Sequence, residues 1–108
     1  MISRGGNKVT PVEIEQSICS HADVAAAMAV GIDDSLLGQR IHVLVVPRTG
    51  AILDLNAICG HLELRLERFK HPDAYYLADA LPIGRTGKAD RGQLTALIAS
   101  GELAPIKR

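Results

Sequence analysis

Aromatic residues and cysteines are scarce in this chain. Its 108 residues include one Phe, two Tyr and no Trp, so a buried core has to be built from Leu, Ile, Val and Ala. Proteins that bind RNA or single strands stack bases on aromatic side chains, and this sequence offers almost none. The two cysteines, Cys19 and Cys59, fall inside predicted helices. We expect buried thiols there, and a reducing cytoplasmic location fits them.

Net charge and long apolar runs are absent as well. Twelve basic and twelve acidic residues cancel, which leaves no general electrostatic field for a nucleic acid or a membrane surface. No apolar run approaches the ~20 residues of a membrane span, and no apolar segment follows the start to make a signal peptide. The histidines lack metal-ligand spacing, and we assign no metal ligands among them; they are His21, His42, His61 and His71.

The length fits one domain, and the first half predicts one helix and two strands. Thr10, Pro11 and Glu13 form a helix start with a capping box. Residues 24–32 and 41–46 are rich in small or β-branched apolar residues and predict strands. Asp33 and Asp34 lie in the turn expected between them.

The second half predicts a helix, a strand and a helix. Asp54 caps a helix with apolar residues at helical spacing, residues 73–79 predict a short strand, and Asp90 with Gln93 caps a final helix. The apolar positions of the two helices are Leu55, Ile58, Leu62 and Leu66, then Leu94, Leu97 and Ile98. Residues 101–108 form a tail that we expect to be frayed. This order indicates a small α+β sandwich.

The run "LPIGRTGKADR" (residues 81–91) places Lys88 in a loop directly before the last helix. Most loop lysines are simply solvated, and that is the plain interpretation. A Walker phosphate loop is rejected, because Pro82 stands where its first glycine must be and Ala89 replaces its metal-binding hydroxyl. Gly84 and Gly87 leave the backbone free to reshape, so the loop could carry Lys88 to an anion held elsewhere.

The same run strongly resembles the C-terminal signature of adenylate-forming enzymes, the AMP-dependent synthetases and ligases. A second signature, "GGNKVTPVEIE" (residues 5–15), matches their Gly-x-x-Val-x-Pro-x-Glu-Ile-Glu pattern. Between them, "HADVAAAMAVGIDDSLLGQRIHVLVVP" and "RFKHPDAYYLADALP" resemble interior stretches of the family in the same order. The resemblance runs from about residue 3 to residue 98. The forms Thr-Gly-Lys and Pro-x-Glu are most similar to acyl-CoA synthetases.

The resemblance implies a fold and a place in a larger enzyme. Residues 1–100 would be the mobile C-terminal domain of an acyl-CoA synthetase, with a small three-stranded sheet, flanking helices and an N-terminal β-hairpin. The family's phosphate loop, acyl pocket and hinge would all precede Met1, and Mg²⁺ would bind in that N-terminal part. We therefore expect an excised or proteolysed domain, or a split subunit, that needs an N-terminal adenylation domain as partner and is inactive alone.

The resemblance also implies roles for individual residues in an ATP-dependent acid:CoA ligase, with ATP and CoA as co-substrates of a carboxylic acid. Lys88 would be the catalytic lysine of acyl-adenylate formation, in a loop with Thr86 and Gly87, and a candidate for control by a lysine acetyltransferase and deacetylase. The pantetheine arm of CoA would pass a tunnel loop in the second step; that loop comprises Ser3, Arg4, Gly5 and Gly6.

Other interpretations stay open at this point. The acyl acceptor could be a carrier protein rather than CoA, or both motifs could be accidental in a ferredoxin-like, non-enzymatic module that binds a small molecule. Gly5-Gly6 alone is typical of an ordinary hairpin turn. Arg91 is expected to brace the loop or the helix end rather than touch a ligand. Gln39 stands where the family usually has Glu, which is expected to loosen a domain contact.

Overall fold

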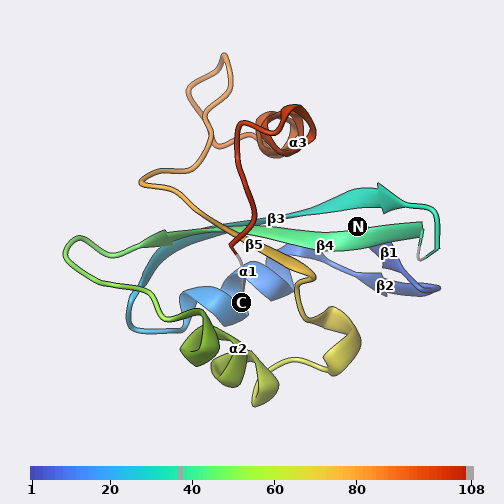
Figure 1. Ribbon diagram of the computed structural model, residues 1–108, viewed down its shortest axis with the longest axis horizontal. Helices are drawn as coiled ribbons and strands as arrows, with labels where there is room; N and C mark the ends of the chain where they lie inside the picture. The colour runs from blue at the N-terminus through green and yellow to red at the C-terminus, as the bar shows by residue number, and fades with distance from the viewer. Residues whose placement is uncertain (37, 107–108) are drawn as a thin grey trace.

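A computed structural model describes residues 1–36 and 38–106 of the chain and has the predicted α+β class. One sheet runs through the middle of the molecule, with two helices on one face and a third helix on the other (Figure 1). The predicted order of the main helices and strands is confirmed. No helix within the described part of the chain has the length and apolar character needed to cross a membrane.

The sheet has five strands, because the N-terminal hairpin joins the three strands that the sequence predicts. Strand β4 lies at the centre: it pairs with β3 antiparallel along its length, with β5 in parallel, and with β1 at a single residue pair, Arg4 with Gly38. The strands are β1 (Ile2–Arg4), β2 (Asn7–Val9), β3 (Val24–Asp34), β4 (Gly38–Pro47) and β5 (Ala74–Leu77). Asp33 and Asp34, predicted as turn residues, therefore both belong to β3.

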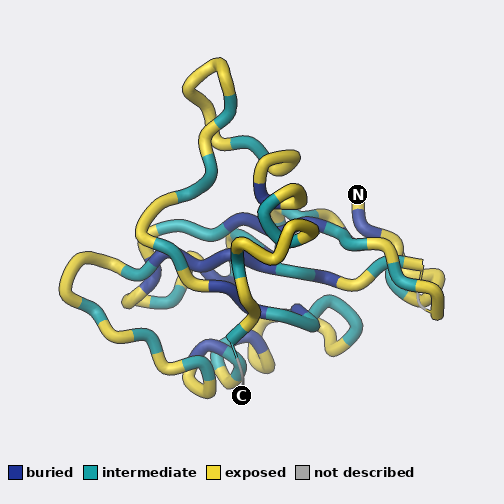
Figure 2. The backbone as a smooth tube through the Cα atoms, turned by 45° about the horizontal axis from the view of Figure 1, so that its top comes forward, coloured by how far each residue is buried: buried dark blue, intermediate teal, exposed yellow. Residues whose placement is uncertain are grey.

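Side chains on β4 alternate between two apolar cores, as the two-residue period of a strand requires. Ile41, Val43 and Val45 point to the face that α1 and α2 cover, whereas Leu44 points to the face of α3. Figure 2 shows buried residues running along the central strands and exposed residues at the loops and hairpin ends. With so few aromatic residues, the cores are largely aliphatic: Tyr75 and the partly buried Phe69 lie on one face, and Tyr76 lies on the other.

The helices begin at the predicted caps. The Glu13 carboxylate accepts from the Thr10 N–H at 3.2 Å, and the Asp54 and Asp90 side chains accept from Asn56 N–H and Gly92 N–H. The helices are α1 (Pro11–Cys19), α2 (Leu55–Glu63) and α3 (Arg91–Ser100), with a short 3₁₀ helix η1 (Arg68–Lys70) after α2.

Two details of the helix predictions are wrong. Helix α2 ends at Glu63, before Leu66, although Leu66 still packs against the core through the following turn. Gln93 does not complete a capping box, because the Asp90 N–H that it would have to bond donates to the Pro82 carbonyl at 3.0 Å.

The expectation of buried thiols fails for Cys19, which is exposed, and Cys59 is only half-buried. Ile14 and Ile18 occupy the buried side of α1. Cys19 follows Ile18 and is therefore turned by about a quarter of a circle away from that side, since a helix has 3.6 residues per turn. Cys59 stands in the same relation to buried Ile58, and its thiol lies 3.6 Å from the Tyr75 hydroxyl.

The C-terminal segment after α3 is ordered through residue 106, so the expected fraying is wrong for that part. Leu103 packs against the core under α3, and Ile106 packs against the core on the opposite face of the sheet. The Ile106 N–H donates to the Tyr75 carbonyl at 2.8 Å. The segment thus passes around the β5 edge from one face to the other (Figure 1). Lys107 and Arg108, also part of the predicted tail, lie outside the described residues.

Candidate functional site

The loop that carries Lys88 is a small closed turn. Ile83 and Ala89 form an isolated antiparallel bridge, the Gly84 N–H donates to the Lys88 carbonyl at 2.9 Å, and the Gly87 N–H donates to the Gly84 carbonyl at 3.0 Å. Gly87 has φ of +80°, in the left-handed region that favours glycine. The loop projects away from the sheet beside the start of α3 (Figure 1).

Gly84 is fixed by close packing at the base of this loop. A Cβ atom on Gly84 would lie 2.6 Å from Asp90 Oδ2, and the same Asp90 carboxylate caps α3 through Gly92 N–H. The expectation that both glycines leave the backbone free to reshape is therefore too broad. Gly84 lets the loop approach the helix cap closely, whereas a Cβ on Gly87 would meet open space.

Lys88 and Thr86 are exposed at the end of this loop. Among the described residues, none forms an ion pair with Lys88. The ammonium group is therefore held out on a short, hydrogen-bonded support without a counter-charge of its own. Such an arrangement suits a cation that meets an anion from outside this chain.

The second candidate element is the β1–β2 hairpin, whose turn is Gly5-Gly6. Both glycines have positive φ, 57° and 85°, as two-residue hairpin turns of the primed types require. A Cβ on Gly6 would meet no atom of this chain within 4 Å. The turn is thus an ordinary hairpin turn in its backbone, and its outer surface is open.

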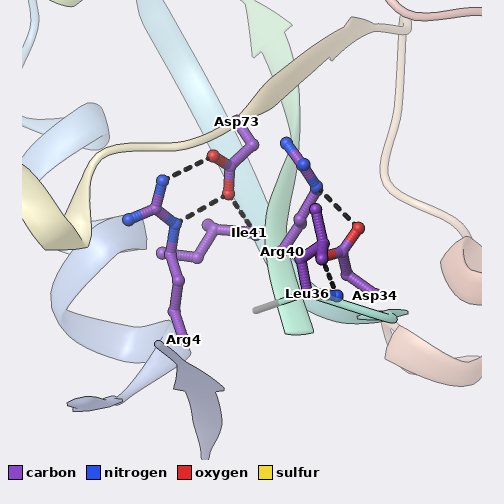
Figure 3. Close-up of polar contacts among 6 residues, drawn as sticks. All are labelled: Arg4, Asp34, Leu36, Arg40, Ile41 and Asp73. Carbon is purple, nitrogen blue, oxygen red and sulfur yellow. Dashed lines mark hydrogen bonds and ion pairs between the residues drawn. The ribbon is translucent and has the colours of Figure 1, made fainter. Parts of the chain in front are cut away.

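Ser3 and Arg4 attach the hairpin to the sheet rather than standing free. The Ser3 N–H donates to Gln39 Oε1 at 2.9 Å. Arg4 forms a two-point pair with Asp73: its Nε lies 3.0 Å from Oδ2 and its NH2 group 2.8 Å from Oδ1. Figure 3 shows this pair, with the backbone N–H of Ile41 donating to the same carboxylate at 2.8 Å. Gln39, which departs from the family pattern, is therefore an anchor of the hairpin.

The two sequence signatures meet through an ion pair. An Arg91 guanidinium nitrogen lies 2.8 and 2.9 Å from the two carboxylate oxygens of Glu15. Glu15 Oε2 also accepts from the Ala29 N–H of strand β3 at 2.8 Å. The expectation that Arg91 braces the start of α3 is confirmed. Through Glu15, the helix that follows the lysine loop is tied to α1 on the other face of the sheet.

The histidines take structural positions. Burial lowers the pKa of His42, whose Nδ1 lies 2.9 Å from the Tyr76 hydroxyl. His61 Nε2 lies 2.6 Å from Ser20 Oγ, between α1 and α2. Across the described residues, no three His, Cys, Asp or Glu side chains gather so as to hold a metal ion.

Comparison with known proteins decides the family. The model of the AMP-binding enzyme C-terminal domain matches residues 13–88. The chain belongs to this family. The C-terminal domain is 36% identical over 91 residues to Probable CoA ligase CCL9 of Humulus lupulus and 34% identical over 91 residues to the oxalate–CoA ligase of Arabidopsis thaliana. These matches cover 84% of this chain and only 17% and 18% of those proteins.

A solved structure agrees. The structure of the coronafacic acid ligase of Pectobacterium brasiliense matches this chain with a TM-score of 0.82 and 29% sequence identity. The match covers 92% of this chain and 19% of the ligase. The family match rules out the alternative in which both signatures are accidental in a ferredoxin-like module. The three relatives named above are ligases, and the chain spans less than a fifth of the length of each.

Sequence reasoning missed three residues that support the candidate elements of this C-terminal domain: Asp73, Gln39 as an anchor, and Glu15. Asp73 follows buried Pro72 and precedes β5, and an acidic residue at the entrance of a buried strand was a usable signal. Glu15 lies in the first signature and Arg91 in the second, so their opposite charges could have suggested a pair. Their distance along the chain, 76 residues, gave no reason to join them.

Proposed function

We propose that this chain is the C-terminal part of an ATP-dependent acid:CoA ligase, which first forms an acyl-adenylate and then transfers the acyl group to CoA. In this proposal Lys88 contributes to the first step and the Ser3–Gly6 turn to the second. The observation that supports it most is Lys88, exposed on a hydrogen-bonded loop and without an ion pair among the described residues, within a chain of the AMP-binding C-terminal family.

Lys88 would stabilise charge at the α-phosphate during adenylation. Attack by the substrate carboxylate brings two anions together, and a cation held at that point is attracted more strongly as charge develops. Lysine suits this role, because its ammonium is a compact charge on a flexible stem that can reach a nucleotide bound to another domain. The same exposure opens Lys88 to acetylation, which would remove the charge and stop the first step.

The Gly5-Gly6 turn would line the path of the pantetheine arm. The arm is narrow, and a backbone without Cβ atoms can approach it closely. A side chain at Gly6 would project into open space from this chain and so into whatever lies against the turn. The lysine loop and the hairpin lie on different sides of the domain (Figure 1). A rotation of the domain between the two steps would present each in turn.

The remaining machinery would belong to an N-terminal adenylation domain. Mg²⁺ would be held there, beside the nucleotide phosphates. The acid substrate would also be selected there, and this chain alone would not adenylate. Pyrophosphate exchange catalysed by this chain by itself would contradict that last point.

Replacing Lys88 tests the first assignment in the complete enzyme. Lys88→Ala should lower acid-dependent pyrophosphate exchange on the order of 10²- to 10³-fold, since it removes a charge donor at the reacting phosphate. Thioester formation from supplied acyl-adenylate should be spared. Arg85→Ala is the matched control, because Arg85 is an exposed cation three residues away in the same loop. Equal loss in both half-reactions, or equal loss in both variants, would contradict the role of Lys88.

Replacing Gly6 tests the second assignment. Gly6→Trp should block CoA transfer and leave pyrophosphate exchange intact. Gly50→Trp is its control: Gly50 has φ of +81° against +85° for Gly6, and a Cβ at either position meets nothing within 4 Å. The backbone strain is thus matched, so an effect of Gly6→Trp alone points to the tunnel. Transfer to a carrier protein instead of CoA by the wild-type enzyme would favour the other acceptor.

A further inference from the structure

The β1–β2 hairpin has little backbone attachment to the rest of the sheet. Strands β3 and β4 pair at ten positions, whereas β1 meets β4 only where Arg4 faces Gly38. Ile2 and Val9 at the base of the hairpin are buried in the core. Two polar contacts lie nearer its turn, from Gln39 to the Ser3 N–H and from Asp73 to Arg4. The direction in which the Gly5-Gly6 turn points therefore depends on side-chain contacts.

Asp73 is the stronger of these two attachments. Its carboxylate accepts two hydrogen bonds from the Arg4 guanidinium and one from the Ile41 N–H, and its own N–H donates to the Ile41 carbonyl at 2.7 Å. The Asp73 side chain is 13% exposed and that of Arg4 25%. Two-point pairs between guanidinium and carboxylate fix orientation as well as distance, and this one joins the hairpin to the junction of β4 and β5 (Figure 3).

The charge state of Asp73 supports this geometry. Burial by itself would raise the pKa of the Asp73 carboxyl. The hydrogen bonds from Arg4 and from the Ile41 N–H, together with the positive charges of Arg4 and Arg40, outweigh burial, so the pKa lies below its ordinary value. Asp73 is therefore ionised at neutral pH. A lowered folded-state pKa contributes stability that is fully present above the unfolded value, about 3.9, and that is lost as the pH falls through the folded value. The attachment therefore persists through the physiological range and weakens in strong acid.

We propose that Asp73 is a positioning residue for the thioester-forming step: by holding Arg4, it sets the direction of the Gly5-Gly6 turn toward the thiol arm of CoA. This inference rests on the proposed function of the hairpin. It assigns no part in adenylation to Asp73, because the lysine loop lies on another side of the molecule (Figure 1). Asp73 acts through Arg4 and the hairpin backbone.

A different role for Arg4 makes the opposite prediction. If Arg4 served mainly to bind the phosphates of CoA, its pairing with Asp73 would compete with that role. Neutralising Asp73 would then release the guanidinium and improve or preserve the use of CoA. If Asp73 positions the turn, the same change impairs the use of CoA.

The test is Asp73→Asn in the complete enzyme. Asparagine can still accept from the Ile41 N–H through its one oxygen, but it carries no charge, and its NH2 group cannot accept the second hydrogen bond from Arg4. We expect kcat/KM for CoA, measured from supplied acyl-adenylate, to fall about 10- to 100-fold, because a displacement of about 1 Å in a reacting geometry has costs of that order. Pyrophosphate exchange should stay within about twofold of wild type.

Asp34→Asn is the matched control. Asp34 pairs with Arg40 at 2.9 Å on the nearby end of the β3–β4 pair (Figure 3), and asparagine would still accept from the Leu36 N–H. This variant should leave both half-reactions unchanged. If Asp73→Asn does not fold, Arg4→Lys replaces it, since that variant keeps the Asp73 carboxylate for Ile41 and loses only the two-point geometry.

A second readout needs no activity. In ¹H–¹⁵N spectra of the 108-residue chain, the amides of residues 3–7 should shift and lose protection from hydrogen exchange in Asp73→Asn but not in Asp34→Asn. Unchanged hairpin amides, an improved use of CoA, or equal loss in both half-reactions would overturn the inference. The proposed function has its own contradicting result: Lys88→Ala leaves pyrophosphate exchange intact, while the hairpin amides of Asp73→Asn shift as expected.

Discussion

At the residue scale, Gly84 leaves almost no room for a Cβ atom, because Asp90 Oδ2 would lie 2.6 Å from it. The lysine loop can close onto the cap of α3 only because Gly84 has no Cβ. The Asp90 carboxylate cannot simply move aside, since it is short and already bonded to the Gly92 N–H at 2.8 Å. A glycine that looks like a source of loop flexibility is thus a close-contact position.

Gly84→Ala should therefore destabilise the chain, although alanine normally suits ordered backbone better than glycine. The new Cβ would displace the Asp90 cap, and loss of a helix cap costs about 0.5–2 kcal/mol. Gly60→Ala is the control: Gly60 lies within α2, and a Cβ there meets nothing within 4 Å. That change should stabilise by about 0.5–1 kcal/mol. Urea unfolding measures both, and the same sign for both would contradict the close-contact argument.

At the scale of elements, Glu15 connects three of them. It lies on α1, accepts from the β3 backbone at Ala29, and pairs with Arg91 at the start of α3. The two members of the ion pair differ in exposure: the Arg91 side chain is 48% exposed and the Glu15 side chain 16%. Water can replace the carboxylate for Arg91 more easily than for the β3 amide.

Replacing Arg91 should consequently lower the free energy of unfolding less than replacing Glu15. Arg91→Ala should cost less than about 1 kcal/mol, the range of exposed ion pairs. Glu15→Ala should cost about 1–3 kcal/mol, because it also leaves the Ala29 N–H without its acceptor. Thermal and urea unfolding of both variants checks this order. A larger loss from Arg91→Ala would mean that the ion pair, rather than the backbone bond, carries the stabilisation.

The same elements show which features a sequence can reveal. Helix starts at Thr10, Asp54 and Asp90 were predictable, since caps are local signals. The strands predicted over residues 24–32 and 41–46 form, since small and β-branched apolar residues are also a local signal, but they extend to 24–34 and 38–47. The attachments of the candidate site were not. Arg4 and Asp73 are 69 residues apart, and neither type of residue indicates its partner. The exposure of Cys19 was also missed, because the prediction did not consider which side of the helix faces the core; Cys19 follows buried Ile18 and is turned away from that side.

At the scale of the whole molecule, the segment after α3 contributes to both cores. Leu103 packs on the face of α3, and Ile106 packs beside α2 and β5 on the other face, where it lines a small apolar pocket with Leu53 and Leu77. The segment crosses the β5 edge of the sheet between these contacts. It therefore holds the two layers together as well as covering apolar surface.

Ile106→Ala should lower the free energy of unfolding by about 1–2 kcal/mol, somewhat less than the 2–5 kcal/mol of a fully buried isoleucine, because Ile106 is half-buried. Ile52→Ala is the control, since Ile52 is 92% exposed and should change stability little. Equal values from urea unfolding would show that the segment adds nothing to the fold.

The placement of α3 has a practical consequence for anyone who shortens this polypeptide. The family model matches residues 13–88, yet Leu94, Ile98 and Leu103 come later and pack against the core on the α3 face of the sheet. A piece trimmed to the matched stretch would turn Leu44 and its apolar neighbours toward water. Such a piece should self-associate through this exposed apolar surface. Aggregation of the shortened piece would then result from the loss of α3 and the segment after it.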